Sequence, residues 1–410
     1  MKVLVLNSGS SSQKACLYEI GETLPYRPLR PLWEGRIEWG SDTAAVSVKN
    51  AQGAVQKETL KVRSREEFMR HLLDTMDTGP ARAIASLSEI GAVGHRVVHG
   101  GPHFEDPVIV TPEVRSAIAE VSTWAPLHVR EELQGMDIVE SLLGPVPQIA
   151  VFDTGFYRQM PVYAQTYPGP YEWSKRDIRR YGFHGTNHKY CAGRAAQLLG
   201  KDPDSLKVVS CHLGNGCSVT AMQGGQSVDT TMGFTPLEGV MMGTRSGSVD
   251  PAILTFLMRQ DKLNADQIDR LLNQESGLLG VSGVSSDMRD ILAAIKQGNE
   301  RAKLAFDIFV HRLQSAVGGM AAVLGGLDVL VFTAGVGENS PEVRAAVGDR
   351  LEFLGLKLDS KVNQQPSLDC DIAAADSRVR VLVIRAEEDW AIAEECWKLV
   401  RAPLAVSSAG

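Results

Sequence analysis

The 410-residue sequence lacks the short motifs that most often mark nucleotide-binding and disulfide-bonded proteins. It contains no G-x-x-x-x-G-K-[ST] segment, which excludes a P-loop, and Gly335-Val336-Gly337 lacks the third glycine of G-x-G-x-x-G, which disfavours a dinucleotide fold. The six cysteines include no C-x-x-C pair, so we expect buried, reduced thiols rather than a disulfide framework. No apolar run approaches the ~20 residues that span a bilayer.

Charge and composition exclude further classes of protein. The net charge of −7 argues against non-specific nucleic-acid binding, which needs a basic face. Hydrophobic residues make up 44% and charged residues 22%, both ordinary for a globular protein, and the length suits two domains. The sequence opens with a core strand, which leaves no room for a signal peptide. We therefore expect a cytoplasmic protein with no nucleic-acid or membrane partner.

Two strand–turn–strand units are the most informative features of the chain. An apolar strand from Val3 to Leu6 leads into the hydroxyl- and glycine-rich turn Asn7-Ser-Gly-Ser-Ser-Ser-Gln-Lys14. A similar strand, Lys207 to Cys211, leads into His212-Leu-Gly-Asn-Gly216, although this turn could also be an ordinary Asn-Gly hairpin. Backbone N–H groups, hydroxyls and an ammonium can hold phosphate. One such loop in each half predicts two related domains that grip one nucleotide between them.

Strand and helix patterns alternate along the chain and predict an α/β fold with mixed sheets. Strands are expected at 2–6, 14–20, 34–38, 46–49, 90–98, 148–152, 207–222 (a hairpin), 329–333 and 380–384. Helices are expected at 65–76, from 111 onward, and at 128–142, 187–199, 250–258, 266–273, 299–319 and 389–400. Loops are expected at 277–286 and 334–339, and an irregular stretch at 156–180 opens the second domain.

Arginines and histidines in apolar or glycine-rich surroundings are the candidate anion ligands. Arg96 stands among apolar residues, so it needs an anionic partner, either an internal salt bridge or a substrate carboxylate. His184 and His188 have the i, i+4 spacing of some zinc enzymes, but Gly185 replaces the glutamate of H-E-x-x-H, which favours a phosphoryl donor. Arg245, in a glycine-flanked loop, either neutralises charge in phosphoryl transfer or is simply solvated.

Together these segments resemble the acetate kinase (acetokinase) family, within the acetate and sugar kinase/Hsp70/actin superfamily, from Asn7 to about Ala393. The resemblance implies two ribonuclease-H-like, actin-like ATPase domains with mixed sheets and a nucleotide cleft between them. Residues 1–153, joined by a C-terminal helix at about 387–402, would form the first domain. Residues 154–386 would form the second, with the nucleotide site and the interface of a homodimer. The matching motifs are NSGSSSxK (7–14), HRVVHGG (95–101), APLH (125–128), FDT (152–154), GFHGT (182–186), HLGNG (212–216), GTRSG (243–247), SDMR (286–289) and GVGEN (335–339).

The resemblance also implies roles for individual residues. Asp153, His184 and Arg245 would be catalytic, and Arg96 would bind the substrate carboxylate. Asn7 and Glu388 would bind Mg²⁺, or Mn²⁺ in its place, with Glu387 as an alternative because the usual Thr-Asn-Glu-Glu reads Arg-Ala-Glu-Glu here. The pocket for the substrate methyl group would be lined by Val98, Leu127, Phe183 and Pro236. ATP would be held by Ser10, Ser12, Lys14, His212, Leu213, Gly214, Asn215, Gly216, Asp287, Met288, Arg289, Gly335, Val336, Gly337, Glu338 and Asn339.

The implied reaction is ATP + acetate ⇌ ADP + acetyl phosphate by direct in-line transfer. A carboxylate is already ionised near pH 7 and needs no general base, so we expect Asp153 to orient Arg96 or a hydrated Mg²⁺. A propionate or butyrate kinase of the same family is the nearest alternative. The resemblance implies that Val98 favours acetate, because propionate-preferring members tend to have a smaller residue at this position. A sugar kinase or a non-enzymatic ATP-driven binding protein is more distant.

Overall fold

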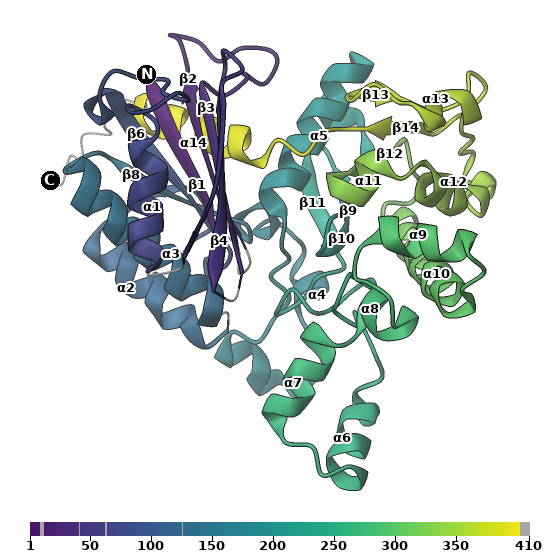
Figure 1. The fold of residues 1–410 in the computed structure, drawn as a ribbon. Coiled ribbons are helices and arrows are strands. Elements are labelled where there is room, and N and C mark those ends of the chain that lie inside the picture. The colour runs from purple at the N-terminus through teal and green to yellow at the C-terminus, as the bar shows by residue number, and fades with distance from the viewer. Residues whose placement is uncertain (9–11, 41, 62–63, 125, 402–410) are drawn as a thin grey trace, which may run out of the picture. The chain divides into compact units, whose positions relative to one another are not determined.

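The computed structural model describes residues 1–410 except 9–11, 41, 62–63, 125 and 402–410, with backbone alone at 8, 12, 123 and 126–128. The described residues form two compact units (Figure 1). Unit 1 comprises Met1–Gly155 and the segment that begins at Glu387. Unit 2 comprises Phe156–Ala386. The chain therefore leaves unit 1 once and returns to it with its last helix.

The described part of unit 1 contains an eight-stranded mixed sheet. Strand β1 pairs in parallel with β6, and β6 with β8, whereas the other neighbours are antiparallel. The carboxyl ends of β1, β6 and β8 therefore lie at one edge of the sheet. The strand order is β5 (Val55–Lys61), β4 (Thr43–Asn50), β3 (Trp33–Trp39), β2 (Ser12–Glu19), β1 (Lys2–Ser8), β6 (Ile90–Val97), β8 (Gln148–Phe152) and β7 (Val108–Ile109).

Side chains alternate between the two faces of this sheet and are buried on both. Leu4 and Leu17 share a core with helix α1 (Arg65–Asp74) and helix α3 (Pro126–Leu143). On the other face, Tyr18 meets Trp390 of helix α14 (Glu388–Arg401) with ring centroids 5.5 Å apart. Helix α14 thus packs on the first strands of the chain, which places its N-terminus in unit 1. Helix α2 (Pro112–Glu120) packs on α3.

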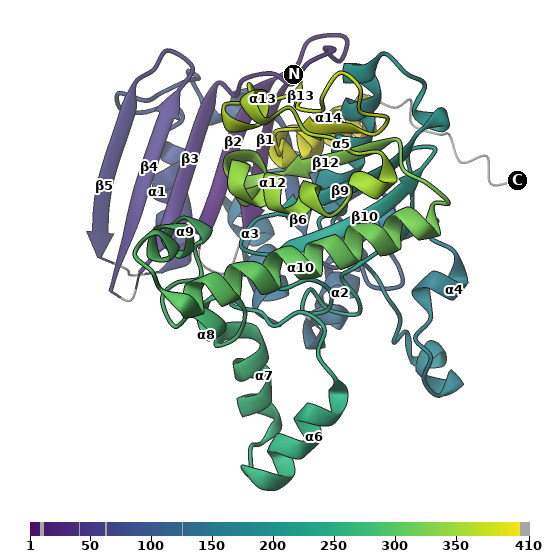
Figure 2. The ribbon, with the colours of Figure 1, turned by 90° about the vertical axis from the view of Figure 1, so that its right-hand side faces the viewer.

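The described part of unit 2 contains a six-stranded mixed sheet that repeats one device of unit 1. The hairpin β9–β10 pairs its first strand in parallel with β12, as β1 of the hairpin β1–β2 pairs with β6. Helix α5 (Gly185–Leu199) packs against the face that carries Val208 and Val331. Helix α10 (Glu300–Val323) packs along β9, β10 and β11 (Figure 2). The strand order is β11 (Gln226–Thr230), β10 (Cys217–Gln223), β9 (Lys207–Leu213), β12 (Val329–Thr333), β14 (Arg380–Val383) and β13 (Cys370–Asp371).

Shorter elements complete the described chain. The α-helices are α4 (Val162–Gln165), α6 (Pro251–Gln260), α7 (Ala265–Gln274), α8 (Gly277–Ser282), α9 (Met288–Lys296), α11 (Ala334–Asn339), α12 (Pro341–Asp349) and α13 (Ser360–Gln364). The 3₁₀ turns are η1 (Leu87–Glu89), η2 (Val121–Thr123), η3 (Gly155–Tyr157), η4 (Tyr171–Arg176), η5 (Pro203–Ser205) and η6 (Glu352–Leu354). Within the described ranges, none of these or the longer helices combines the length and apolar character of a membrane span.

The expected α/β class with mixed sheets is confirmed, but two of the expected loops are wrong. Residues 277–282 and 334–339 form helices α8 and α11 instead. Their glycines lower intrinsic helix propensity, and tertiary packing overrides it. Helices α9 and α12 were not predicted, although Asp287 and Ser340 accept hydrogen bonds from the first turns as N-caps. The cysteines are free, as expected, and five of the six are buried.

Candidate functional site

The edge of the unit 1 sheet gathers five polar side chains. Asn7 lies near the end of β1, Arg96 near the end of β6, and Asp153 directly after β8. Glu388 and Asp389 open helix α14. Parallel pairing of the strands and packing of α14 on β1 and β6 bring together residues far apart in the sequence.

Arg96 and Asp153 form the centre of this cluster. The Nη2 and Nε groups of Arg96 donate to Oδ2 of Asp153 at 2.5 and 3.0 Å, and its Nη1 donates to Oδ1 of Asn7 at 3.1 Å. The Asp153 side chain is only 1% exposed, so the ion pair compensates its buried charge. The internal salt bridge that the sequence left open is therefore present. Its geometry also agrees with a role for Asp153 in orienting Arg96.

Asp389 is the residue of this cluster that the sequence did not single out. Its carboxylate pairs with Nζ of Lys14 at 2.5 Å and accepts from Nδ2 of Asn7 at 3.2 Å and from Sγ of Cys16 at 3.6 Å. Lys14, expected to hold ATP, is therefore tied to a carboxylate in the structure. Asp389 directly follows Glu387 and Glu388, the two alternatives for the metal ligand, and it is the first residue of the expected helix 389–400, where an acidic residue is common.

Glu388 interacts electrostatically with the charged side chains of this cluster. Burial raises its pKa, the negative charges of Asp153 and Asp389 raise it further, and Arg96 and Lys14 lower it. Acidic oxygens are thus concentrated at this edge of the sheet. Among the described residues, no group of three or more His, Cys, Asp or Glu side chains has the arrangement of a metal site.

A second cluster, in unit 2, surrounds the turn between β9 and β10. His184 precedes α5 in the left-handed conformation, with φ of 58°, and its ring stacks on His212 at 4.0 Å between centroids. A Cβ on Gly216 would lie 3.4 Å from both Nε2 of His184 and Nη1 of Arg245. A Cβ on Gly214 would lie 3.5 Å from Nε2 of His212. The glycines therefore leave open the space onto which an arginine and two histidines converge, which suits an anion.

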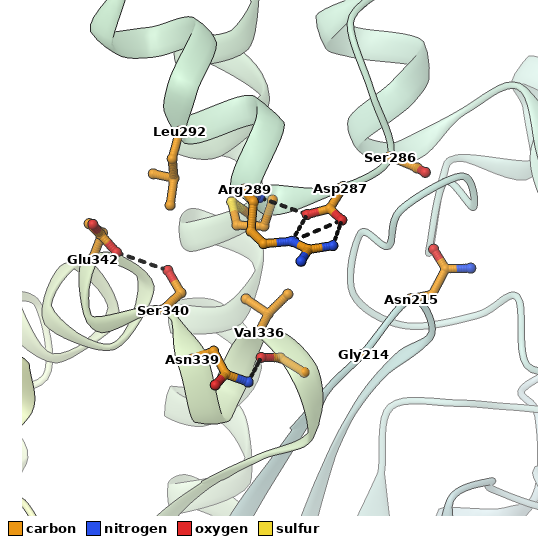
Figure 3. Close-up of a pocket in the computed structure, with 12 residues that line it drawn as sticks. Gly214, Asn215, Ser286, Asp287, Arg289, Leu292, Val336, Asn339, Ser340 and Glu342 are labelled. Atoms are coloured by element: carbon orange, nitrogen blue, oxygen red, sulfur yellow. Dashed lines mark hydrogen bonds and ion pairs between the residues drawn. The ribbon is translucent and has the colours of Figure 1, made fainter. Parts of the chain in front are cut away.

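Next to this turn, unit 2 contains a pocket of about 590 Å³ (Figure 3). Three of the segments expected to hold ATP contribute to it. The Arg289 guanidinium bonds to the Asp287 carboxylate at the pocket wall, and Nδ2 of Asn339 donates to the carbonyl of Gly335 (Figure 3). The lining residues are Gly214, Asn215, Ser286, Asp287, Met288, Arg289, Leu292, Gly335, Val336, Asn339, Ser340 and Glu342. Ser286, Leu292, Ser340 and Glu342 were not predicted.

Some residues expected to hold ATP do not line this pocket but make contacts within the fold. Leu213 is fully buried, and Gly337 packs against the backbone of Phe332. Oε1 of Glu338 accepts from the backbone N–H of Ala386 at 2.8 Å, and burial raises the pKa of this carboxyl. These residues support the walls rather than line the cavity. Ser10 lies outside the described residues, and Ser12 is described by its backbone alone.

The four residues expected to contact the substrate methyl group divide between the units. In unit 1, Val98 is buried and its N–H donates to Oε1 of Glu132 at 2.9 Å, while Leu127 is described by its backbone alone. In unit 2, Phe183 is buried, and the carbonyl of Pro236 accepts from Nη1 of Arg245 at 2.8 Å. Glu132 was missed because the pair Glu131-Glu132 on a helix has the pattern of an ordinary exposed, charged turn.

Comparisons with known proteins find one family over nearly the whole chain. The model of the acetokinase family matches residues 2–394. An acetate kinase of Trichormus variabilis is 55% identical over 403 residues, which cover 98% of this chain and 100% of the relative. One of Gloeobacter violaceus is 56% identical over 405 residues, with the same coverage.

The structure is also similar to solved structures over nearly its full length. The structure is similar to the crystal structure of Porphyromonas gingivalis acetate kinase, with a TM-score of 0.89, 42% identity and coverage of 98% and 100% of the two chains. It is also similar to a propionate kinase from Francisella tularensis subsp. tularensis, with a TM-score of 0.87, 35% identity and coverage of 97% and 99%.

Proposed function

The chain belongs to the acetokinase family, and on that premise we propose that it transfers a phosphoryl group reversibly between ATP and acetate, giving ADP and acetyl phosphate. The observation that carries the proposal is the convergence of Arg245, His184 and His212 on the Gly216 turn, next to the 590 Å³ pocket. Pockets of this size suit a ligand such as a nucleotide. Donors beside it suit the charge that spreads over a phosphoryl group in transit.

Arg96 suits an acceptor that is a carboxylate. Such an acceptor is already ionised, so the barrier is the approach of two anions and not the removal of a proton. A guanidinium has five N–H donors, and three of those on Arg96 are used by Asp153 and Asn7 among the described residues. The other two can take a carboxylate oxygen. Asp153 then acts by holding Arg96 in place.

Magnesium is proposed as the divalent ion. The oxygen donors around Asn7 and Glu388 suit a hard cation that takes one or two carboxylates and keeps several waters. Glu388 is favoured over Glu387 because its carboxyl interacts with Arg96 and Asp153. When bound, the ion would neutralise charge on the β- and γ-phosphates.

We also propose that two copies of the chain associate through unit 2. Helix α6 has no buried residue, although its sequence is largely apolar. Ile253, Phe256 and Met258 are 47%, 59% and 44% exposed. Such exposure on one helix is typical of an interface. Sedimentation equilibrium should give a dimer for the parent protein and a monomer for Phe256→Glu. The free cysteines fit a reducing compartment such as the cytoplasm.

The activity is tested by steady-state kinetics with ATP and Mg²⁺ on acetate, propionate and butyrate, with the acyl phosphate trapped as hydroxamate. We expect the highest kcat/KM for acetate, since one methylene is worth about 1–3 kcal/mol in such a pocket. A higher value for propionate would retain the kinase and reject the acceptor. No hydroxamate from any of the three would reject the kinase. Arg96→Ala should raise the KM for acetate more than that for ATP.

A further inference from the structure

A buried hydroxyl lies between two histidine rings behind the phosphoryl site of unit 2. Oγ of Ser218, on β10, is 2.9 Å from Nδ1 of His184 and 2.7 Å from Nε2 of His188, on α5. Ser218 and His188 are both fully buried. The other ring nitrogen of His188, Nδ1, is buried without a hydrogen-bond partner in the structure. The three side chains therefore form a short chain of hydrogen bonds that ends at His184.

Which atom donates in each of these hydrogen bonds depends on the positions of the ring protons and of the hydroxyl proton. Burial lowers the pKa of His188 well below its ordinary value, so its ring is neutral and carries one N–H. If that proton were on Nδ1, an N–H donor would be buried with no acceptor, which is rare in proteins. With the proton on Nε2, His188 donates to Ser218. The Ser218 hydroxyl still has its own proton to donate, and Nδ1 of His184 lies 2.9 Å from it. Donation to this nitrogen leaves the proton of a neutral His184 on Nε2.

The neighbouring histidine is set in the same way by a different partner. Nδ2 of Asn187, which can only donate, lies 2.9 Å from Nδ1 of His212. The His212 proton is therefore also on Nε2. Both stacked rings then present N–H donors on the nitrogens that lie close to Gly214 and Gly216.

We propose that Ser218, supported by His188, is a positioning residue that fixes the proton of His184 on Nε2 and so makes this ring a hydrogen-bond donor to the transferred phosphoryl group. The catalytic consequence rests on the proposed kinase function. A neutral His184 with its proton on Nδ1 would turn a lone pair toward the phosphoryl oxygens. That would repel the charge that develops there instead of stabilising it.

The first experiment reads the tautomer directly in the resting protein. Long-range ¹H–¹⁵N correlation spectra of protein labelled with ¹⁵N-histidine distinguish the two neutral tautomers, and loss of one signal set in His184→Gln assigns that ring. We expect the Nε2–H tautomer for His184 in the parent protein. In Ser218→Ala, we expect a mixture or a shift toward Nδ1–H. An Nδ1–H tautomer in the parent, or an unchanged spectrum in Ser218→Ala, would overturn the proposal even if the protein is an active kinase.

Kinetics with ATP and acetate provide the second readout. We expect Ser218→Ala to lower kcat about 10- to 100-fold, the range seen when the partner that orients a metal-bound histidine is lost. The KM values for acetate and ATP should change less than threefold in comparison. Ser218→Thr, which retains a hydroxyl and suits a strand, should recover most of kcat. A Thr variant as slow as the Ala variant, with native circular dichroism, would overturn the role of the hydroxyl.

Thr220 provides the matched control. It is a buried hydroxyl residue two positions along the same strand, and its Oγ1 bonds to that of Thr230 at 2.9 Å and to Oη of Tyr157 at 3.3 Å. Thr220→Val also removes a buried hydroxyl, but none of these bonds involves the side chain of His184 or His188. We expect the His184 signals and kcat to match those of the parent. Equal losses of kcat in the Thr220 and Ser218 variants would mean that general loosening of β10 explains the effect and would refute the proposal. If the parent protein makes no hydroxamate, the proposed function fails while the spectra still decide the tautomer.

Discussion

Glu132→Gln should remove a pH-dependent loss of stability from unit 1. The Glu132 carboxyl, on α3, is only 2% exposed. Oε1 accepts from the N–H of Val98 at 2.9 Å, and Oε2 is buried without a hydrogen-bond partner in the structure. Burial raises the pKa of Glu132 from 4.5 to about 8, against the opposing effects of the Val98 N–H and Arg96. The side chain is therefore neutral in the folded protein near pH 7.

The sign of the effect follows from proton binding. Between pH 4.5 and about 8 the folded state holds a proton on Glu132 that the unfolded state has released. Stability from this group is thus fully present below pH 4.5 and lost by about pH 8. At 1.36 kcal/mol per pKa unit, the difference between 4.5 and about 8 corresponds to at most about 5 kcal/mol. Relaxation of the folded state around the charge lowers this maximum. Glutamine keeps the size of the side chain and stays neutral at every pH.

Urea unfolding followed by circular dichroism, with refolding curves to establish reversibility, measures the difference between variant and parent. We expect the two free energies of unfolding to be similar near pH 5 and the Gln variant to be more stable by several kcal/mol near pH 9. Glu140→Gln, at an exposed position on the same helix, is the control and should show a small, pH-independent difference. The same difference between Glu132→Gln and the parent at both pH values would refute a buried, protonated Glu132.

Three further predictions concern the site. Arg344→Met should lower the free energy of unfolding in urea by about 1–3 kcal/mol for each of the two backbone carbonyls of the 335–339 segment that lose this buried donor, and it should raise the KM for ATP. An unchanged KM would show that Arg344 does not position the pocket. Gly216→Ala should lower kcat by up to about 100-fold with little change in melting temperature, because the new Cβ would occupy space 3.4 Å from Nη1 of Arg245 and Nε2 of His184, the proposed phosphoryl ligands. A large fall in melting temperature would indicate a folding defect instead. Asp153→Asn should lower kcat roughly 100-fold at every pH, because Asp153 holds Arg96; recovery of the rate at alkaline pH would instead identify a general base.

Local pattern was enough to find the strands that carry the site. The apolar runs before Asn7, Asp153 and His212 are short, which favours strands over helices, and the structure places these polar residues at or near strand ends. The resemblance of the ordered motifs to one family was equally readable, because each motif keeps its residue types and its place in the order.

The prediction of loops was wrong in two segments where glycine lowers helix propensity but the tertiary structure is helical. The segments 277–282 and 334–339 have low helix propensity, and they are helical because they pack on distant elements of unit 2, α8 on α10 and α11 on β9, which no local pattern shows.

The sequence by itself determined the α/β class, the positions of the two turns that we propose to bind phosphate, and the family. Residue types and spacing along the chain specify these features. Only the tertiary structure decided which polar groups pair with one another. Asp389 with Lys14, Glu132 with the N–H of Val98, and Ser218 between two histidines are contacts between distant segments. Burial makes an unpaired polar group costly, so the fold and not the local sequence selects each partner and, with it, each protonation state.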